Sequence, residues 1–252
     1  MTAALTQRKT VSEVHPTAAA AAEAAADLIE QLVHAGRLRT LGVATGSSPS
    51  PLYRELARRG LALSGLTLFA LDEYLGLPAG HPESYRAVVE REVARPLGIP
   101  AARVHLPDGR DPAAYDRLIA DHGGVDLQLL GVGRNGHIGF NEPGSPFDSC
   151  TRVVDLDPST RAANSRFFLS ADDVPHQAVT QGIATILSAR RLMVLASGTD
   201  KAPAVAAALD GPRTEDVPAS VLRDHGDVSW FIDRDAASLL AGAGAAIRDA
   251  VS

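Results

Sequence analysis

The sequence predicts an α/β fold, a single Rossmann-like domain in which a mostly parallel sheet carries helices on both faces. Short continuous apolar runs alternate along the chain with amphipathic helical patterns, and such runs are typical of strands buried on both faces of a parallel sheet. The chain of 252 residues is 45% hydrophobic, which is enough to fill the core of one large domain. Polar, glycine-rich clusters follow several of the apolar runs.

The first predicted helix covers residues 17–36, TAAAAAEAAADLIEQLVHAG, where strong helix formers precede Gly36 as a stop signal. A buried strand is expected next, in RTLGVAT at residues 39–45. By the same reasoning, the further helices are expected at 50–59, 84–97, 112–122, 175–188, 201–209 and 235–250. The further strands are expected at 66–71, 126–130, 191–196 and 228–232. We treat residues 1–252 as one domain and expect residues 1–15 to form a flexible extension.

Composition excludes several classes of function. A formal net charge of -6 disfavours binding to nucleic acid or to an anionic membrane, because both need a positive face. No apolar run of 18 residues is present, and the N-terminal segment lacks the apolar core of a secretory signal. We therefore expect a cytoplasmic protein. The single cysteine, Cys150, excludes an internal disulfide and a cluster of thiolate metal ligands.

Ligands of open α/β sheets bind outside the carboxyl ends of the strands. Four polar clusters stand at such positions: TGSSPS after LGVA, DEY after LFAL, GVGRNGH after LQLL and SGTDK after MVLA. The four clusters are therefore expected to meet at one edge of the sheet and to form the binding site there.

The cluster GVGRNGH has the glycine spacing G-x-G-x-x-G of a dinucleotide-binding turn. That turn requires a helix to begin at its third glycine. Here Gly136 leads into HIGFNEPGSP, where Gly139, Pro143 and Gly144 disfavour a helix. We therefore expect a loop with its own chemistry and no bound cofactor.

This loop holds Asn135, His137 and Glu142 within eight residues. Histidine titrates near neutral pH, and a neighbouring carboxylate can fix its tautomer and stabilise the imidazolium, so a His-Glu pair is expected. The alternative is a loop histidine bound only to backbone. No H-E-x-x-H motif or Cys/His cluster indicates a metal site.

Asp72 and Glu73 follow the strand at 66–71. Adjacent side chains of an extended segment point in opposite directions, so only one carboxylate is expected to face the site, and we choose Asp72. Partial withdrawal from water would make it a stronger base. The alternative is that Asp72 caps a helix or turn.

Two further clusters suit a phosphate group. Free backbone N–H groups and hydroxyls before the helix at 50–59 can hold an anion, and they belong to Thr45, Gly46, Ser47 and Ser48. Lys201 lies near the start of another helix, and the planar guanidinium of Arg166 suits phosphate oxygens. Each cation by itself is better explained as a surface charge, so the prediction rests on their joint placement.

Six segments together resemble glucosamine-6-phosphate deaminase, also called glucosamine-6-phosphate isomerase. They are VATGSSP (43–49), LDEYLGLPAGHPESYR (71–86), DLQLLGVGRNGHIGFNEPGSP (126–146), STRAANSRFF (159–168), VPHQAVTQGIATIL (174–187) and ASGTDKA (196–202). The resemblance covers about residues 20–235. The motifs DEYxGLPxxHPESY and GHIGFNEP are far more specific than the glycine spacing.

The resemblance implies a cofactor-independent conversion of glucosamine 6-phosphate and water into fructose 6-phosphate and ammonia. It implies that His137 helps to open the pyranose ring, that Asn135 and Glu142 position this imidazole, and that Asp72 moves a proton between C2 and C1. It implies that the phosphate is held by Gly46, Ser47, Ser48, Arg166 and Lys201. Both monomers and hexamers occur in the family, so a homo-oligomer stays open.

The chain departs from the family pattern in three places. Some members carry aspartate where this chain has Asn135. Members activated by N-acetylglucosamine 6-phosphate have an R-x-K pattern after the NEP loop, whereas here Arg152 is followed by Val154, which argues against activation. Arg223 and Asp224 replace the expected glutamine and its neighbour before His225, which leaves room for an altered sugar preference.

Three alternatives remain beside the deaminase. A galactosamine 6-phosphate enzyme would share the phosphate and C1/C2 chemistry. A 6-phosphogluconolactonase has a related fold, although the DEY and GHIGFNEP motifs argue against it. A noncatalytic sugar phosphate sensor would need a DNA-binding helix-turn-helix and a basic face, and the sequence shows neither.

Overall fold

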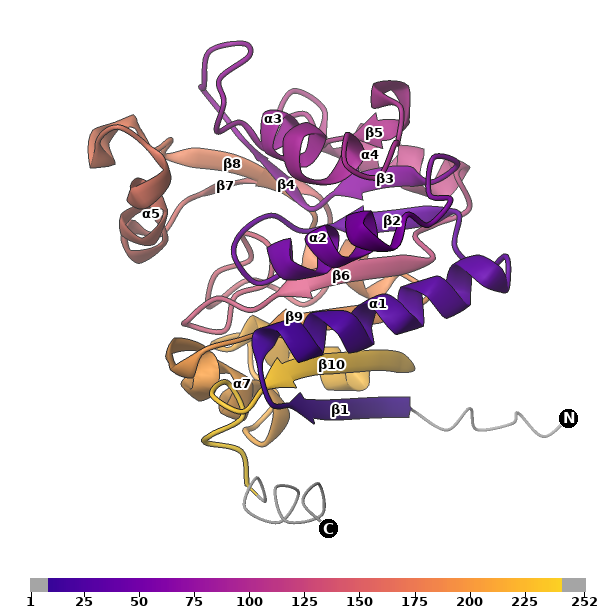
Figure 1. Cartoon of the computed structure of the whole chain (residues 1–252). Coiled ribbons are helices and arrows are strands. Elements are labelled where there is room, and N and C mark those ends of the chain that lie inside the picture. The colour runs from indigo at the N-terminus through magenta and orange to yellow at the C-terminus, as the bar shows by residue number, and fades with distance from the viewer. Residues whose placement is uncertain (1–8, 242–252) are drawn as a thin grey trace, which may run out of the picture.

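A parallel sheet forms the centre of the computed structural model, which describes residues 9–241. Within that range the sheet has seven strands in the order β1-β10-β9-β6-β2-β3-β5, and every pairing is parallel. The strands are β1 (Lys9–His15), β2 (Thr40–Val43), β3 (Thr67–Ala70), β5 (Val104–His105), β6 (Leu127–Gly131), β9 (Leu192–Ala196) and β10 (Asp227–Asp233). All their carboxyl ends point the same way, to the left in Figure 1.

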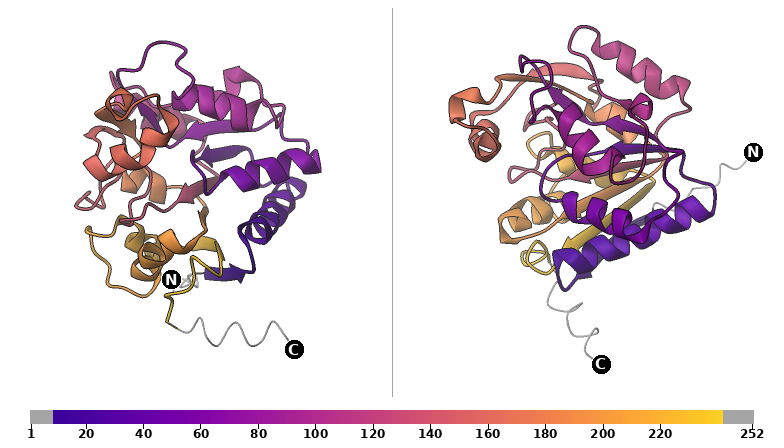
Figure 2. Two further views of the ribbon diagram at one scale, coloured as in Figure 1. Left: turned by 60° about the vertical axis from the view of Figure 1, so that its left-hand side comes forward. Right: turned by 45° about the horizontal axis from the view of Figure 1, so that its top comes forward.

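Helices cover both faces of this sheet, as the sequence predicts (Figure 2). The helices and helical turns of one face are α1 (Ala18–His34), α2 (Ser50–Arg59), α3 (Tyr85–Val89) and the π-helix η1 (Glu90–Ala94). Those of the other face are α4 (Pro112–Asp121), α6 (Ile183–Leu187), α7 (Ala202–Leu209) and the 3-10 turn η6 (Pro218–Asp224). No helix in the described range is long and apolar enough to cross a membrane.

Two hydrophobic clusters lie on the two faces because successive strand residues point in opposite directions. Leu68 and Ala70 of β3 pack into the α1/α2 side, whereas Phe69 between them packs into the α4/α7 side. Trp230 of β10 is fully buried on the latter side. Burial on both faces explains why these strands read as continuous apolar runs.

A second, antiparallel sheet branches from the first. Its order is β4-β8-β7, formed by β4 (Asp72–Tyr74), β8 (Gln177–Thr180) and β7 (Arg152–Asp155). Between β7 and β8 lie α5 (Pro158–Asn164), η3 (Ser165–Phe167) and η4 (Ala171–Asp173). We call residues 152–180 the flap; it extends beyond the carboxyl edge of the main sheet at the upper left of Figure 1.

Three expected elements differ from the structure. The helix expected at 175–188 is wrong: β8 occupies its first part, because Ala178 and Val179 pair with β4 and β7, and only Ile183–Leu187 is helical. The extension expected at residues 1–15 is wrong for Lys9–His15, which pair with β10 as an edge strand; residues 1–8 lie outside the described range. Of the helix expected at 235–250, residues 235–241 form turns, and the rest lies outside that range.

Other differences are small. The helix expected at 84–97 changes from α3 to the π-helix η1 within its length. The short strands β4, β5 and β7 were not expected. A strand of two to four residues carries too few side chains to show a period of its own.

Candidate active site

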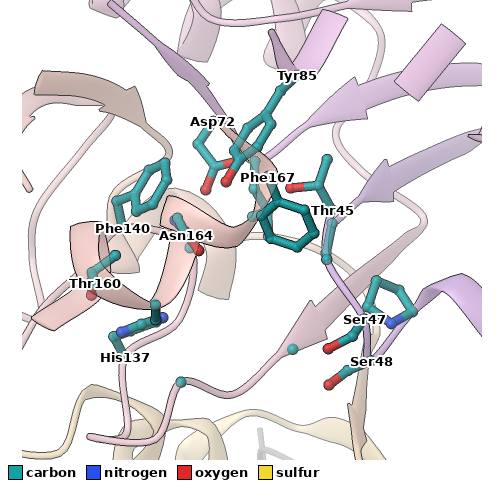
Figure 3. A pocket seen from close by; sticks show the side chains of 18 of the residues that line it. Thr45, Ser47, Ser48, Asp72, Tyr85, His137, Phe140, Thr160, Asn164 and Phe167 are labelled. Carbon is teal, nitrogen blue, oxygen red and sulfur yellow. The ribbon is translucent and has the colours of Figure 1, made fainter. Parts of the chain in front are cut away.

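A pocket of about 840 Å³ lies at the carboxyl ends of the parallel strands, where the loops after β2, β3, β6 and β9 meet the flap. Figure 3 shows that His137 and Thr160 lie on one side of it and Ser47 and Ser48 on the other. All of the expected site residues except Glu142 line the pocket: Thr45, Gly46, Ser47, Ser48, Asp72, Asn135, His137, Arg166 and Lys201. Glu142 lies behind His137, which it contacts.

Asp72 occupies the point at which the chain leaves β3 and enters β4. Its side chain lines the pocket, yet the residue is only 6% exposed. Burial raises the pKa of Asp72 well above its usual value, and the neighbouring charge of Glu73 adds to the rise. A carboxylate in this setting is a stronger base than one in water.

Glu73 points the other way, as alternation along a strand requires. Its carboxylate accepts hydrogen bonds from the backbone nitrogens of Tyr74 and Tyr85, each at 2.8 Å, and of Arg86 at 2.9 Å. Glu73 therefore holds the start of α3, and Asp72 is the member of the pair that faces the pocket.

The glycines of GVGRNGH form a tight turn and leave space for the imidazole of His137. The turn closes through hydrogen bonds from Gly133 N to His137 O (2.9 Å) and from Gly136 N to Gly133 O (3.0 Å). Gly136 has φ +86°, a conformation that favours glycine. A Cβ on Gly133 would lie 2.3 Å from Cε1 of His137. The second glycine is therefore explained by the space that the imidazole occupies.

The structure brings Asn135, His137 and Glu142 together. His137 Nδ1 lies 3.3 Å from Glu142 Oε2, an ion-pair distance, although the geometry is not that of a directed hydrogen bond. Asn135 Nδ2 donates to the same carboxylate oxygen at 2.7 Å, and Asn135 Oδ1 accepts from the His137 backbone at 3.2 Å. The imidazole thus faces a carboxylate, unlike a histidine bound only to backbone.

Glu142 is held in its ionised form. Burial opposes its charge, but contacts with His137, Thr160 and Asn135 outweigh that effect and lower the pKa of Glu142 to about 2. The Thr160 hydroxyl donates to Oε1 at 2.5 Å. At neutral pH a fixed negative charge therefore stands behind the imidazole.

The opposite side of the pocket is suited to an anion. The loop of Thr45, Gly46, Ser47 and Ser48 leads into α2, and Gly46 has φ +103°. The Arg166 guanidinium lies 4.7 Å from the centre of the Phe167 ring. Burial lowers the pKa of Lys201, and the positive charges of Arg134 and Arg166 lower it further against the opposing effect of Asp200. A phosphate would relieve this repulsion among cations.

The loop that carries Lys201 is held by Asp233 of the neighbouring strand β10. Asp233, at the end of β10, accepts from Gly198 N at 3.0 Å and from Ala236 N at 2.8 Å. Gly198 has φ +89°. These contacts set where Lys201 enters the pocket.

Several residues of the pocket were not anticipated. Arg134 and Asp200 form an ion pair of 2.9 Å at its wall, and both lie within clusters that the sequence does mark. Tyr85, Thr160 and Phe167 also line it. The latter two belong to the flap, whose position could not be inferred without its antiparallel strands.

The region from 218 to 228 does not line the pocket but packs against the turn before His137, where Ala219 N donates to Gly136 O at 2.9 Å. His225 places its two ring nitrogens 2.9 Å from Asp227 O and 2.8 Å from Ala189 O. Arg223 donates to Leu209 O and Ser220 O. Neither these residues nor Asp224 lines the pocket, so the departures at Arg223 and Asp224 do not alter its wall directly.

The comparisons with known proteins agree with this geometry. Residues 13–230 match the family model described as glucosamine-6-phosphate isomerases/6-phosphogluconolactonase. The glucosamine-6-phosphate deaminase of Pseudarthrobacter chlorophenolicus is 52% identical over 225 residues, which are 86% of this chain and 87% of that protein.

The chain belongs to the glucosamine-6-phosphate deaminase family.

Another deaminase of the family, from Rhodococcus jostii, is 49% identical over 92% of this chain and 91% of its own. A solved monomeric glucosamine-6-phosphate deaminase superposes with a TM-score of 0.87 at 40% identity, covering 91% of this chain and 99% of that one. The 6-phosphogluconolactonase of Trypanosoma brucei has a TM-score of 0.76 but only 24% identity, so that likeness shows the fold alone. The resemblance and the fold class inferred from the sequence are both confirmed.

Proposed function

We propose that this chain is a glucosamine-6-phosphate deaminase, which converts D-glucosamine 6-phosphate and water into D-fructose 6-phosphate and ammonia. The observation that carries the proposal is the convergence of a buried aspartate, a His-Glu pair and a cluster of cations on one pocket. The reaction needs these three elements: a base, a group that opens the sugar ring, and an anchor for the phosphate.

Ring opening is assigned to His137. The imidazole, with Glu142 behind it, transfers the proton between the anomeric hydroxyl and the ring oxygen. The ionised Glu142 stabilises the imidazolium that forms, and Asn135 keeps the Glu142 carboxylate in place. The product of this step is the open-chain aldehyde.

Isomerisation and loss of ammonia are assigned to Asp72. Its carboxylate takes the proton from C2 of the open-chain sugar, giving an enolamine, and returns a proton to C1. The C2 amine then becomes an imine. Water adds to C2, the C–N bond breaks, and ammonia leaves with the proton that it needs. The sum consumes one water and no redox cofactor.

The phosphate is assigned to the far side of the pocket. Lys201 and Arg166 supply the charge, and Thr45, Gly46, Ser47 and Ser48 supply hydroxyl and backbone donors. Binding at that end presents C1 and C2 to Asp72 and His137.

The decisive experiment is an ammonia-release assay on the purified chain. Glucosamine 6-phosphate, galactosamine 6-phosphate and their N-acetyl forms are compared, with hydrolysis of 6-phosphogluconolactone measured in parallel. Preferred release of ammonia from glucosamine 6-phosphate is expected. Preference for the C4 epimer, lactone hydrolysis alone, or binding without turnover would instead favour the galactosamine enzyme, the lactonase or the sensor, respectively.

The proposal extends to the oligomeric state and the cellular location of the enzyme. We propose that activity does not require a homo-oligomer, because the solved deaminase with 40% identity to this chain is described as monomeric; gel filtration coupled to the assay tests this. We also propose a cytoplasmic location, because a charged sugar phosphate does not cross a bilayer unaided and stays in the compartment in which it is made.

A further inference from the structure

We propose that Thr160 of the flap is a positioning residue for ring opening, acting through the carboxylate of Glu142. The inference rests on the proposed function and deepens it, because it connects the flap to the His-Glu pair.

The two oxygens of Glu142 are held from different parts of the chain. Oε2 contacts Asn135 Nδ2 at 2.7 Å and His137 Nδ1 at 3.3 Å, and both residues belong to the same loop as Glu142. Oε1 instead accepts from the hydroxyl of Thr160 at 2.5 Å, across 18 residues and from α5 of the flap. A glutamate carboxylate that is hydrogen-bonded at only one oxygen can rotate about its Cγ–Cδ bond, whereas hydrogen bonds to both oxygens prevent this rotation.

Thr160 is itself held firmly. It is 5% exposed. At the start of α5, the Asp157 carboxylate accepts from Ser159 N at 2.7 Å. Farther along, Arg161 donates to Val174 O, and Asn164 Nδ2 donates to the Tyr74 hydroxyl at 2.9 Å. These contacts tie α5 to the strand that begins with Asp72 and to the segment before β8.

The consequence concerns the imidazole. The His137 ring is placed by the Gly133 turn on one side and by Glu142 on the other. If Oε1 loses its partner, the Glu142 carboxylate is free to turn away from Nδ1, and the imidazole loses its fixed orientation toward the sugar ring oxygen. Substrate affinity, which depends on Lys201 and Arg166, is not expected to change.

The first test compares Thr160→Val, which keeps the shape of the side chain and removes the hydroxyl, with Thr160→Ser, which keeps the hydroxyl. We expect Thr160→Val to lower kcat about 10-fold, with KM unchanged within about twofold, because the variant loses one charge-assisted hydrogen bond to Glu142. Thr160→Ser keeps that bond and should keep kcat within about threefold of the wild type. Ser165→Ala is the matched control: it removes a hydroxyl of the same segment, which donates to Ala162 O, and should leave kcat unchanged.

A double-mutant cycle tests whether Thr160 acts through Glu142. In the Glu142→Gln background, adding Thr160→Val should change kcat by less than about twofold, because residues that act as one unit are not additive. A full additional 10-fold loss would overturn the inference.

Ring opening can also be observed without deamination. In Asp72→Asn protein, the interconversion of the α and β anomers of glucosamine 6-phosphate, followed by NMR exchange, reports ring opening alone. Thr160→Val should slow the protein-dependent exchange about 10-fold and Thr160→Ser should restore it. Equal exchange in the Val variant, or no protein-dependent exchange at all, would refute the role of Thr160. Failure of the wild type to release ammonia, with exchange behaving as expected, would refute only the proposed function.

Discussion

At the residue scale, the carboxylate pair Asp72 and Glu73 shows how one fold assigns opposite tasks to adjacent side chains. The two point to opposite sides of β4, so one lines the pocket and the other holds the start of α3. That only one of the two faces the pocket was predictable from sequence, because side chains alternate along a strand; alternation did not determine which one. Partial withdrawal of Asp72 from water was expected, but the extent of the burial that raises its pKa depends on segments distant in the chain.

Asp72→Asn is expected to lower kcat for ammonia release by about 10²–10⁴-fold, the usual contribution of a general base. The amide keeps the size of the side chain but cannot accept the C2 proton. Steady-state kinetics and circular dichroism check the result together. Turnover equal to that of the wild type in a folded variant would remove Asp72 from the mechanism.

Gly133→Ala tests the space reserved for the imidazole. The added methyl would lie 2.3 Å from the His137 ring, so the ring must move, and we expect kcat to fall at least about 10-fold because catalysis depends on ångström-scale placement. Gly226→Ala, whose added Cβ has no neighbour within 4 Å, is the control. If both variants turn over alike, the glycine spacing of this loop has another cause.

At the scale of elements, the carboxyl ends of the parallel strands determine where the pocket lies. The four clusters that follow β2, β3, β6 and β9 were predicted to meet, and the pocket is lined by all four. The flap was not predicted, because its strands are short and pair only with partners distant in the sequence. Thr160 and Phe167 were therefore missed as members of the pocket, whereas Arg166 was named for its guanidinium and for the family resemblance.

Lys201 carries a prediction for the loop after β9. Lys201→Ala should raise KM for glucosamine 6-phosphate about 10- to 100-fold with a smaller effect on kcat, because charge-assisted hydrogen bonds contribute about 1.5–3 kcal/mol. Arg110→Ala, an exposed cation paired with Asp108, controls for net charge. Equal affinity of the Lys201 variant for the sugar phosphate would contradict the anion site.

The same lysine predicts a pH dependence. Because burial lowers the pKa of Lys201, its positive charge is present at low pH and is lost as the pH rises through that lowered pKa. KM of the wild type should therefore rise toward alkaline pH, and KM of the Ala variant should not. A pH series of KM values for both proteins makes the comparison.

At the scale of the whole molecule, Asp126 joins three parallel strands at the amino edge of the main sheet. Asp126 directly precedes β6, and its buried carboxylate accepts from Arg39 N at 2.8 Å and from Thr40 N at 3.1 Å at the start of β2. It also pairs with Arg190, which lies just before β9. The sheet is thus fixed at the edge opposite the pocket by one charged group. The residues at the carboxyl edge, where the pocket lies, take no part in these contacts of Asp126.

Asp126→Asn should lower the free energy of unfolding by about 1.5–3 kcal/mol at pH 7, as for other hydrogen bonds to charged groups. Burial opposes ionisation, but Arg39 N, Thr40 N and Arg190 outweigh it and lower the pKa of Asp126. The contribution is therefore present above the unfolded pKa of about 4 and is lost as the pH falls through the lowered folded pKa. Denaturant melts at pH 7 and near pH 3 should show the difference between the two proteins shrink in acid.

The branch between the two sheets has a mechanical consequence. The chain passes from β3 into β4 through a single residue, Leu71, which bonds to Val43 O on one side and accepts from Gln181 N on the other. A tilt of the smaller sheet about this junction would displace Asp72, the next residue, less than Arg166, which lies in η3 between β7 and β8. A shift of the flap would thus change the proposed phosphate contact of Arg166 and leave the proposed base, Asp72, beside the main sheet.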